Sequence, residues 1–205
     1  MLGVSDYGAF VLAFILLLFL PGPGNLALVH ATGLGGLRGG LASIAGLLLG
    51  DQVLMWLTVA GVAALLQSRP ALFGGLQAVG AAYLAWMGWR MWRPRMGSAG
   101  PIRVRAGRYF ADTLLITVLN PKSAIFYFAF FPQFIDPQQH RGILTFAFMA
   151  VTVIALGFVY CLGVVLLTHT LAQRLRARPH WTLWLNRLAG VCLMGFGLRL
   201  LWPAS

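Results

Sequence analysis

Runs of about 20 apolar residues recur along the chain, separated by short connections rich in glycine, proline or arginine. As a helix, a run of this length matches the thickness of the hydrocarbon core of a bilayer. Of the 205 residues, only 9% are charged, whereas soluble domains carry about 25% charged residues. Because lipid cannot satisfy free backbone polar groups, apolar runs that cross it form helices. The sequence therefore predicts an all-α integral membrane protein.

The apolar runs divide the chain into six predicted spans. One long polar connection, at about residues 93–107, has three spans on either side of it. We therefore predict a single membrane domain over residues 1–205, with a first repeat at about 5–92 and a second at about 108–202. A short glycine-rich turn around Arg38 is expected between the first two spans. The expected spans lie at about residues 5–33, 41–66, 71–92, 109–134, 143–168 and 181–202.

Arginine is unevenly distributed between the two sides of the membrane that six spans define. The connections after the first, third and fifth spans hold ten arginines, and the opposite side holds Arg69, Arg141 and Arg199. Since cytoplasmic loops are enriched in cations, the 93–107 loop is predicted to be cytoplasmic and both termini periplasmic. The net charge of +11 comes from only 15 basic residues, mostly between apolar runs. We therefore expect the lipid bilayer, and no nucleic acid, as a partner.

Two proline-containing stretches interrupt the first and fourth predicted helices, at residues 19–25 (FLPGPGN) and 119–122 (LNPK). Proline lacks the backbone N–H and clashes with the preceding turn, and glycine costs roughly 1 kcal/mol against alanine. Each break also resembles a helix start, because Asn120 suits the N-cap and Pro121 the first helical position. Helices 1 and 4 are therefore predicted to end at a break and begin again.

Because each half contains three spans, the second half would enter the membrane inverted. Interrupted helices at matching places in two inverted halves point to a transporter binding site. The two helix starts would meet head-on, each with unpaired N–H groups and about half a positive charge, which suits a carboxylate. Two kinks needed only for packing are the alternative. The candidate binding residues at the breaks are Pro21, Gly22, Pro23, Gly24, Asn25, Asn120, Pro121 and Lys122.

Two ionisable residues, Asp51 and Lys122, fall near the centre of their predicted spans. An unpaired charge there costs at least about 3 kcal/mol, so we expect one cluster, with Asp51 either facing Lys122 or carrying a proton. Asp51 would bind a substrate ammonium group or carry the coupling proton; an ion pair that only fixes helix register is the alternative. Thr117 lies near a break, and the Tyr160 phenol needs a partner, so both are candidate site residues. Core packing is the equal alternative for Tyr160.

Other features have structural explanations. Asp112 follows Arg108 by four positions, which is typical of a surface ion pair on a helix. Gly46 and Gly50 form a G-x-x-x-G pattern, which is typical of close helix packing. Both cysteines lie within apolar runs and are expected to pack as small residues. The sequence contains no nucleophile with a paired base, no phosphate-binding loop and no His/Cys cluster. We therefore expect neither an enzyme nor a metal or cofactor site.

Several motifs together resemble those of the LysE/RhtB family of bacterial amino-acid exporters, over nearly the full chain. The stretch 50–55, followed by 60–63, is more similar to the leucine efflux branch of that family. Two positions depart from the family pattern. Gly24 stands where Asp or Asn often follows Pro-Gly-Pro directly, and Thr117 stands where Asn is often found three residues before Asn-Pro-Lys. The motifs are LPGPGN at 20–25, GLLLGD at 46–51, AAYLAWMG at 81–88, LNPKSA at 119–124, FPQFID at 131–136 and LNRLAG at 185–190.

The resemblance implies six helices in two inverted repeats, a bacterial inner-membrane location, and amino-acid export driven by the proton motive force. We expect a neutral, branched-chain amino acid as cargo, leucine first, with its carboxylate at the two breaks and its ammonium group at Asp51. Phe126 and Tyr127 are expected to form apolar walls around an aliphatic side chain. Homoserine, threonine or cysteine-type solutes are the alternative cargo, and a membrane-integral redox or metal-handling component is the alternative from another class. A homodimer is left open.

Overall fold

A computed structural model of the chain describes residues 3–20, 22–68, 86, 89, 104–135 and 142–175. In these residues all regular elements are helices, and the only extended pairing is one isolated antiparallel bridge between Val4 and Ile135. The all-α prediction is confirmed for this part of the chain. The third and sixth expected spans lie outside the described residues, except for Trp86 and Trp89, so the six-helix inverted repeat stays a prediction.

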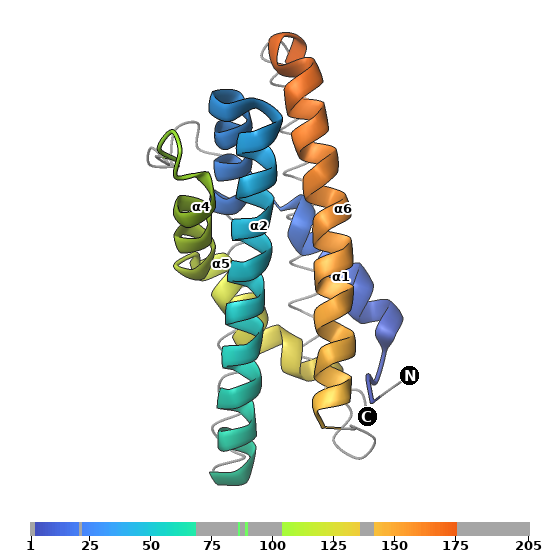
Figure 1. Ribbon diagram of the computed structural model, residues 1–205. Helices are drawn as coiled ribbons and strands as arrows, with labels where there is room; N and C mark the ends of the chain where they lie inside the picture. The colour runs from blue at the N-terminus through green and yellow to red at the C-terminus, as the bar shows by residue number, and fades with distance from the viewer. Residues whose placement is uncertain are drawn as a thin grey trace.

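The elements follow one another along the chain as in Figure 1. The first helix begins where the Asp6 side chain accepts a hydrogen bond from the Ala9 backbone N–H. The elements are α1 (Tyr7–Phe19), α2 (Pro23–Ser68), α4 (Tyr109–Val118), α5 (Pro121–Ile125), the π-helical η1 (Phe126–Phe130), the 3₁₀-helical η2 (Phe131–Phe134) and α6 (Ile143–Leu175).

Both predicted breaks are present. α1 ends at Phe19 and α2 begins at Pro23, while α4 ends at Val118 and α5 begins at Pro121. Asn120 is the N-cap of α5, as expected, because its side-chain oxygen accepts from the Lys122 backbone N–H at 3.1 Å. The chain bends by 50° between α4 and the segment from Pro121 to Phe134.

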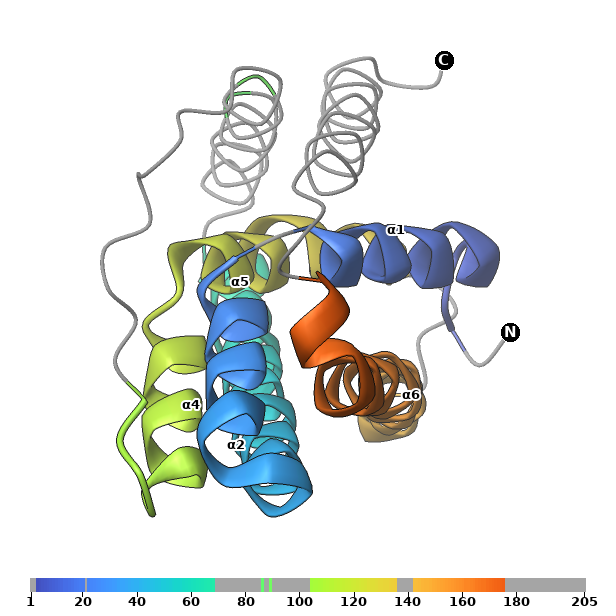
Figure 2. The same ribbon diagram turned by 90° about the horizontal axis from the view of Figure 1, so that it is seen from above.

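α2 is a helical hairpin whose direction reverses at Gly36. The expected turn spanned residues 34–40, but the structure reverses at one residue, with helix on both sides and Arg38 inside the second arm. Gly36 has φ 58° and ψ −148°, a conformation open to glycine because it has no Cβ. The two arms lie side by side (Figures 1 and 2). Gly39 and Gly40 allow this approach, since a Cβ on either would collide with residues of the first arm, at Ala31 and Thr32.

The second arm of α2 lies between α4 and α6 (Figure 2). A Cβ on Gly46 would collide with the Phe110 carbonyl of α4, and a Cβ on Gly50 would meet the Thr117 side chain at 2.8 Å. The predicted close packing at the G-x-x-x-G pattern is therefore confirmed. A buried 2.7 Å hydrogen bond between the Ser43 and Thr113 hydroxyls joins the same two helices.

The described helices suit a membrane by length and composition. Two of them, α2 and α6, contain stretches long and apolar enough to cross a bilayer, and the bent pair of α4 with residues 121–134 would make a third. α6 continues to Leu175, seven residues past the expected end. Large apolar side chains face outward from these helices, among them Leu57, Val151, Val159 and Leu167.

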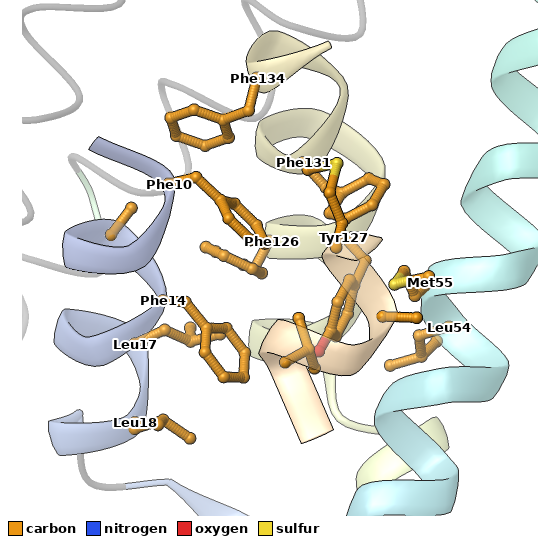
Figure 3. Close-up of a cluster of buried hydrophobic side chains, with 14 of the residues drawn as sticks. Phe10, Phe14, Leu17, Leu18, Leu54, Met55, Phe126, Tyr127, Phe131 and Phe134 are labelled. Atoms are coloured by element: carbon orange, nitrogen blue, oxygen red, sulfur yellow. The ribbon is translucent and has the colours of Figure 1, made fainter. Parts of the chain in front are cut away.

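The main core lies where α1, α2, α6 and the residues after the second break meet (Figure 3). Aromatic rings dominate it: Phe10 lies edge-on to Phe131 with ring centroids 6.0 Å apart, and Phe14 packs against Phe126 at the same distance. Burial of such rings is a major source of stability. This core fixes the short helix α1 and the broken fourth span against the second arm of α2.

Candidate functional site

The two breaks are in contact with each other. The Lys122 ammonium group donates hydrogen bonds to the backbone carbonyls of Leu17, at 3.0 Å, and Leu20, at 2.7 Å. The Lys122 side chain also lies against Gly22, where a Cβ would be 3.2 Å from its Cδ. The last carbonyls of a helix lack partners within it, and a cation there is favourable. The α5 lysine therefore caps the C-terminal end of α1.

Asn25 supports the same helix end from α2. Its amide nitrogen donates to the carbonyls of Leu18, at 2.9 Å, and Leu20, at 3.2 Å. It also lies 3.2 Å from the Tyr160 hydroxyl of α6, which accepts from it. Asn25 and Lys122 together therefore bind the last carbonyls of α1. Tyr160 thus has a polar partner, and hydrogen bonds of Asn25 join α2 to both α1 and α6.

Asp51 lies in the second arm of α2 and is 5% exposed. Lys122 from α5, Tyr127 from η1 and Cys161 from α6 are close enough to act on its carboxylate electrostatically. In the part of the chain that the structure describes, Asp51 and Lys122 form no ion pair within 4 Å, and the single ion pair found there involves other residues. Asp51 and Lys122 are therefore neighbours, while the lysine hydrogen bonds go to α1.

Three buried polar atoms of the described residues lack a hydrogen-bond partner: Gln52 Nε2, Thr117 Oγ1 and the Tyr127 hydroxyl. Gln52 follows Asp51 in α2. Thr117 packs against Gly50, the residue directly before Asp51. Both polar atoms are therefore near Asp51. Leaving a buried polar group unpaired costs about 1–3 kcal/mol. Unsatisfied groups are rare in native proteins and call for an explanation such as a ligand or water.

The structure brings most of the sequence-predicted site residues together. Gly22 and Lys122 are in contact, a Cβ on Gly24 would be 3.9 Å from Thr117 Oγ1, and Asn25 binds Tyr160. Pro21 lies outside the described residues. The rest, Pro23, Asn120 and Pro121, form the helix starts at the two breaks.

Tyr127 was expected to serve only as an apolar wall. Its ring does pack in the core, against Phe126 at 5.4 Å between centroids, but its hydroxyl faces Asp51. The sequence carries one signal of this, since Tyr127 is the one polar residue in a stretch, 126–131, that otherwise holds four phenylalanines and Ala129. The π-helical backbone that sets its direction has no comparable signal.

The expected surface pair of Asp112 with Arg108 is wrong. Asp112 is buried and pairs with Arg105, with 2.6 Å between Arg105 Nη2 and Asp112 Oδ1 and 2.8 Å between the Arg105 backbone N and Oδ2. Arg108 is the N-cap of α4, with φ −116° and ψ 23°. Its carbonyl accepts from the Asp112 backbone N–H at 2.9 Å and its charge still acts on Asp112, but within the described residues the ion pair is made by Arg105.

Apolar helices, two interrupted spans that touch and a buried acid beside a lysine at their junction define a multi-pass membrane transporter. Comparison with known proteins then gives the particular family. Residues 15–203 match the model of the family described as LysE type translocator. The chain belongs to this family, which confirms the resemblance of its motifs and the expectation of a transporter instead of an enzyme.

Relatives match over nearly the whole chain. An uncharacterised membrane protein of Pseudomonas aeruginosa is 33% identical, covering 97% of this chain and 96% of its own. Two proteins named leucine efflux protein are similarly related: that of Klebsiella pneumoniae is 32% identical over 97% of this chain and 95% of its own, and that of an Enterobacter species is 33% identical over 97% and 96%. No solved structure matches the chain.

Proposed function

We propose that the chain exports neutral amino acids from the cytoplasm across the inner membrane, with branched-chain, leucine-like substrates first, driven by the proton motive force. The observation that carries this proposal is the buried Asp51 beside Lys122 at the junction of the two broken helices. The names of the Klebsiella and Enterobacter relatives support leucine as the first substrate to test.

A zwitterionic amino acid needs a positive and a negative partner when it leaves water. Lys122 and the helix starts at the breaks supply positive charge for the carboxylate, and Asp51 supplies negative charge for the ammonium group. In the described conformation Lys122 is bound to the Leu17 and Leu20 carbonyls. Under this proposal the substrate carboxylate competes with those carbonyls, so that substrate binding loosens the end of α1.

Asp51 is also the proposed coupling residue. A buried carboxylate is stable when it faces a cation or carries a proton. The substrate ammonium group stabilises its charged form on the way out, and a proton taken from the periplasmic side neutralises it on the return. One proton entering for each substrate leaving would then follow from the use of one shared carboxylate.

The test is transport by purified protein in lipid vesicles with an imposed pH gradient. The wild type is expected to accumulate labelled leucine against its concentration gradient only when the pH gradient is present. Asp51→Asn and Lys122→Met are expected to lower the rate at least tenfold, because each removes one charge partner of the zwitterion. Asp112→Asn is the matched control, since Asp112 is also a buried acid but pairs with Arg105. Unchanged leucine export by both variants would contradict the mechanism.

The same vesicles separate the alternative cargo. Homoserine, threonine and cysteine are offered beside leucine, isoleucine and valine, and counter-transport is measured for each. A preference for the aliphatic group supports the proposal. A preference for hydroxyl- or thiol-bearing substrates would move the assignment to the alternative within the same family.

A further inference from the structure

Tyr127 lies in the π-helical segment η1, directly after the second break. Its side chain is fully buried. A π-turn holds one residue more than an α-turn, and such turns occur frequently at functional sites. In Figure 3 the Tyr127 ring lies among the apolar side chains of the core, while its hydroxyl oxygen, drawn in red, points away from Phe131.

The polar contacts of the Tyr127 hydroxyl among the described residues are weak. It faces Asp51 in a weak polar contact, but no described group meets ordinary hydrogen-bond geometry with it. A phenylalanine would fill the same space without an unpaired polar atom, and the neighbouring residues Phe126 and Phe128 are phenylalanines. A buried hydroxyl that lacks a well-formed hydrogen bond destabilises the protein, so a ligand that pairs with it would account for its presence.

We propose that the Tyr127 hydroxyl binds the ammonium group of the substrate together with the Asp51 carboxylate. This inference rests on the proposed export of amino acids. An ammonium group has three N–H donors, and a single carboxylate does not satisfy all three once the group has left bulk water. The Tyr127 oxygen accepts a second hydrogen bond on the side of η1, while Asp51 supplies the charge from α2.

The variant that tests this is Tyr127→Phe, which removes one oxygen and keeps the ring. KM for leucine is expected to rise roughly tenfold, the value of a hydrogen bond to a charged group. The maximal rate and the pH dependence of export are expected to stay as in the wild type. Tyr7→Phe is the matched control, because its hydroxyl lies 3.3 Å from Thr152 Oγ1 and belongs to the rim of the same core. It should leave KM unchanged.

A role in positioning Asp51 gives a different result. Among the described residues, the titratable groups close to Asp51 are Lys122, Tyr127 and Cys161. If Tyr127 only orients the Asp51 carboxylate, Tyr127→Phe lowers the maximal rate of export or shifts its pH profile, and KM for leucine stays at the wild-type value. That outcome, or an unchanged KM with an unchanged profile, overturns the proposal. Absence of any wild-type export would instead refute the proposed function.

A second measurement covers a Tyr127→Phe variant that does not fold. 3-Fluorotyrosine is placed at position 127 of the full chain in detergent, and its fluorine resonance is followed while leucine is added. A saturable shift with leucine, and none with N-acetyl-leucine, supports the proposal. A resonance that leucine does not move overturns it.

Discussion

Lys122 has two roles at one position. Its ammonium group caps α1 through the Leu17 and Leu20 carbonyls, and its charge acts on Asp51. A structural cap and a substrate ligand are usually separate residues. Under the proposed function, the Lys122 ammonium group would have to leave the α1 carbonyls to bind the substrate carboxylate, which links occupancy of the proposed site to the order of α1.

Lys122→Met is expected to destabilise the end of α1. The variant removes the charged donor from both carbonyls, which among the described residues keep only the Leu20 backbone N–H and the Asn25 amide as donors. We expect the loss of these charged hydrogen bonds to lower the free energy of unfolding by about 1–3 kcal/mol. Hydrogen exchange in detergent should show faster exchange in α1 and little change in α6. Lys122→Arg retains donors and should protect α1 better. Equal protection of α1 in the wild type and Lys122→Met would show that the cap does not stabilise the helix.

At the scale of elements, small residues determine how closely the helices approach. Along the second arm of α2, Gly39, Ser43, Gly46 and Gly50 recur every three or four positions and face α4 or the first arm. Residues with this spacing lie on one face of a helix. Small residues on such a face let two backbones come close in a membrane.

Gly46→Leu is expected to separate α2 from α4. Even the first atom of the new side chain would collide with the Phe110 carbonyl, and overpacking of this kind costs about 1–3 kcal/mol or more. Thermal unfolding in detergent should show a clearly lower transition temperature. Gly163→Ala in α6 is the control, because in the part of the chain that the structure describes no atom outside its own helix turn lies within 4 Å of its added Cβ. Similar stability of both variants would mean that the close approach at Gly46 is not needed.

The two helix breaks and the N-cap of α5 could be predicted from the sequence. The breaks at Pro23 and Pro121 and the N-cap at Asn120 follow from local backbone chemistry, because proline and asparagine act on their own turn. The sequence predicted a turn over residues 34–40, whereas the chain reverses at Gly36 alone. In a stretch with several glycines, packing of the two arms decides which one takes the positive φ.

At the scale of the whole molecule, the orientation in the membrane remains a prediction from charge. The expected spans and the arginine distribution place the 93–107 loop in the cytoplasm and both termini in the periplasm. The exposed apolar side chains of α2 and α6 agree with contact with lipid, but they do not distinguish the two orientations.

Reporter fusions test this orientation. Alkaline phosphatase joined after Ser205 is expected to be active, because it folds in the periplasm, and a green fluorescent protein at the same place is expected to stay dark. Insertion of either reporter at Gly97 should give the opposite pattern. A fluorescent fusion at Ser205 would place the C-terminus in the cytoplasm and exclude either the six-span count or the predicted orientation.

The sequence by itself determined that this chain forms apolar helices, where two of them break, and which acid and lysine come together near those breaks. These properties depend on residues close together in the chain, so local chemistry reveals them. Only the tertiary structure decided what the polar groups contact. Lys122 and Asn25 bind the end of α1, Asp112 pairs with Arg105, and the Tyr127 hydroxyl faces Asp51. Each of these partners depends on the angle and depth at which helices pack, which no local pattern specifies.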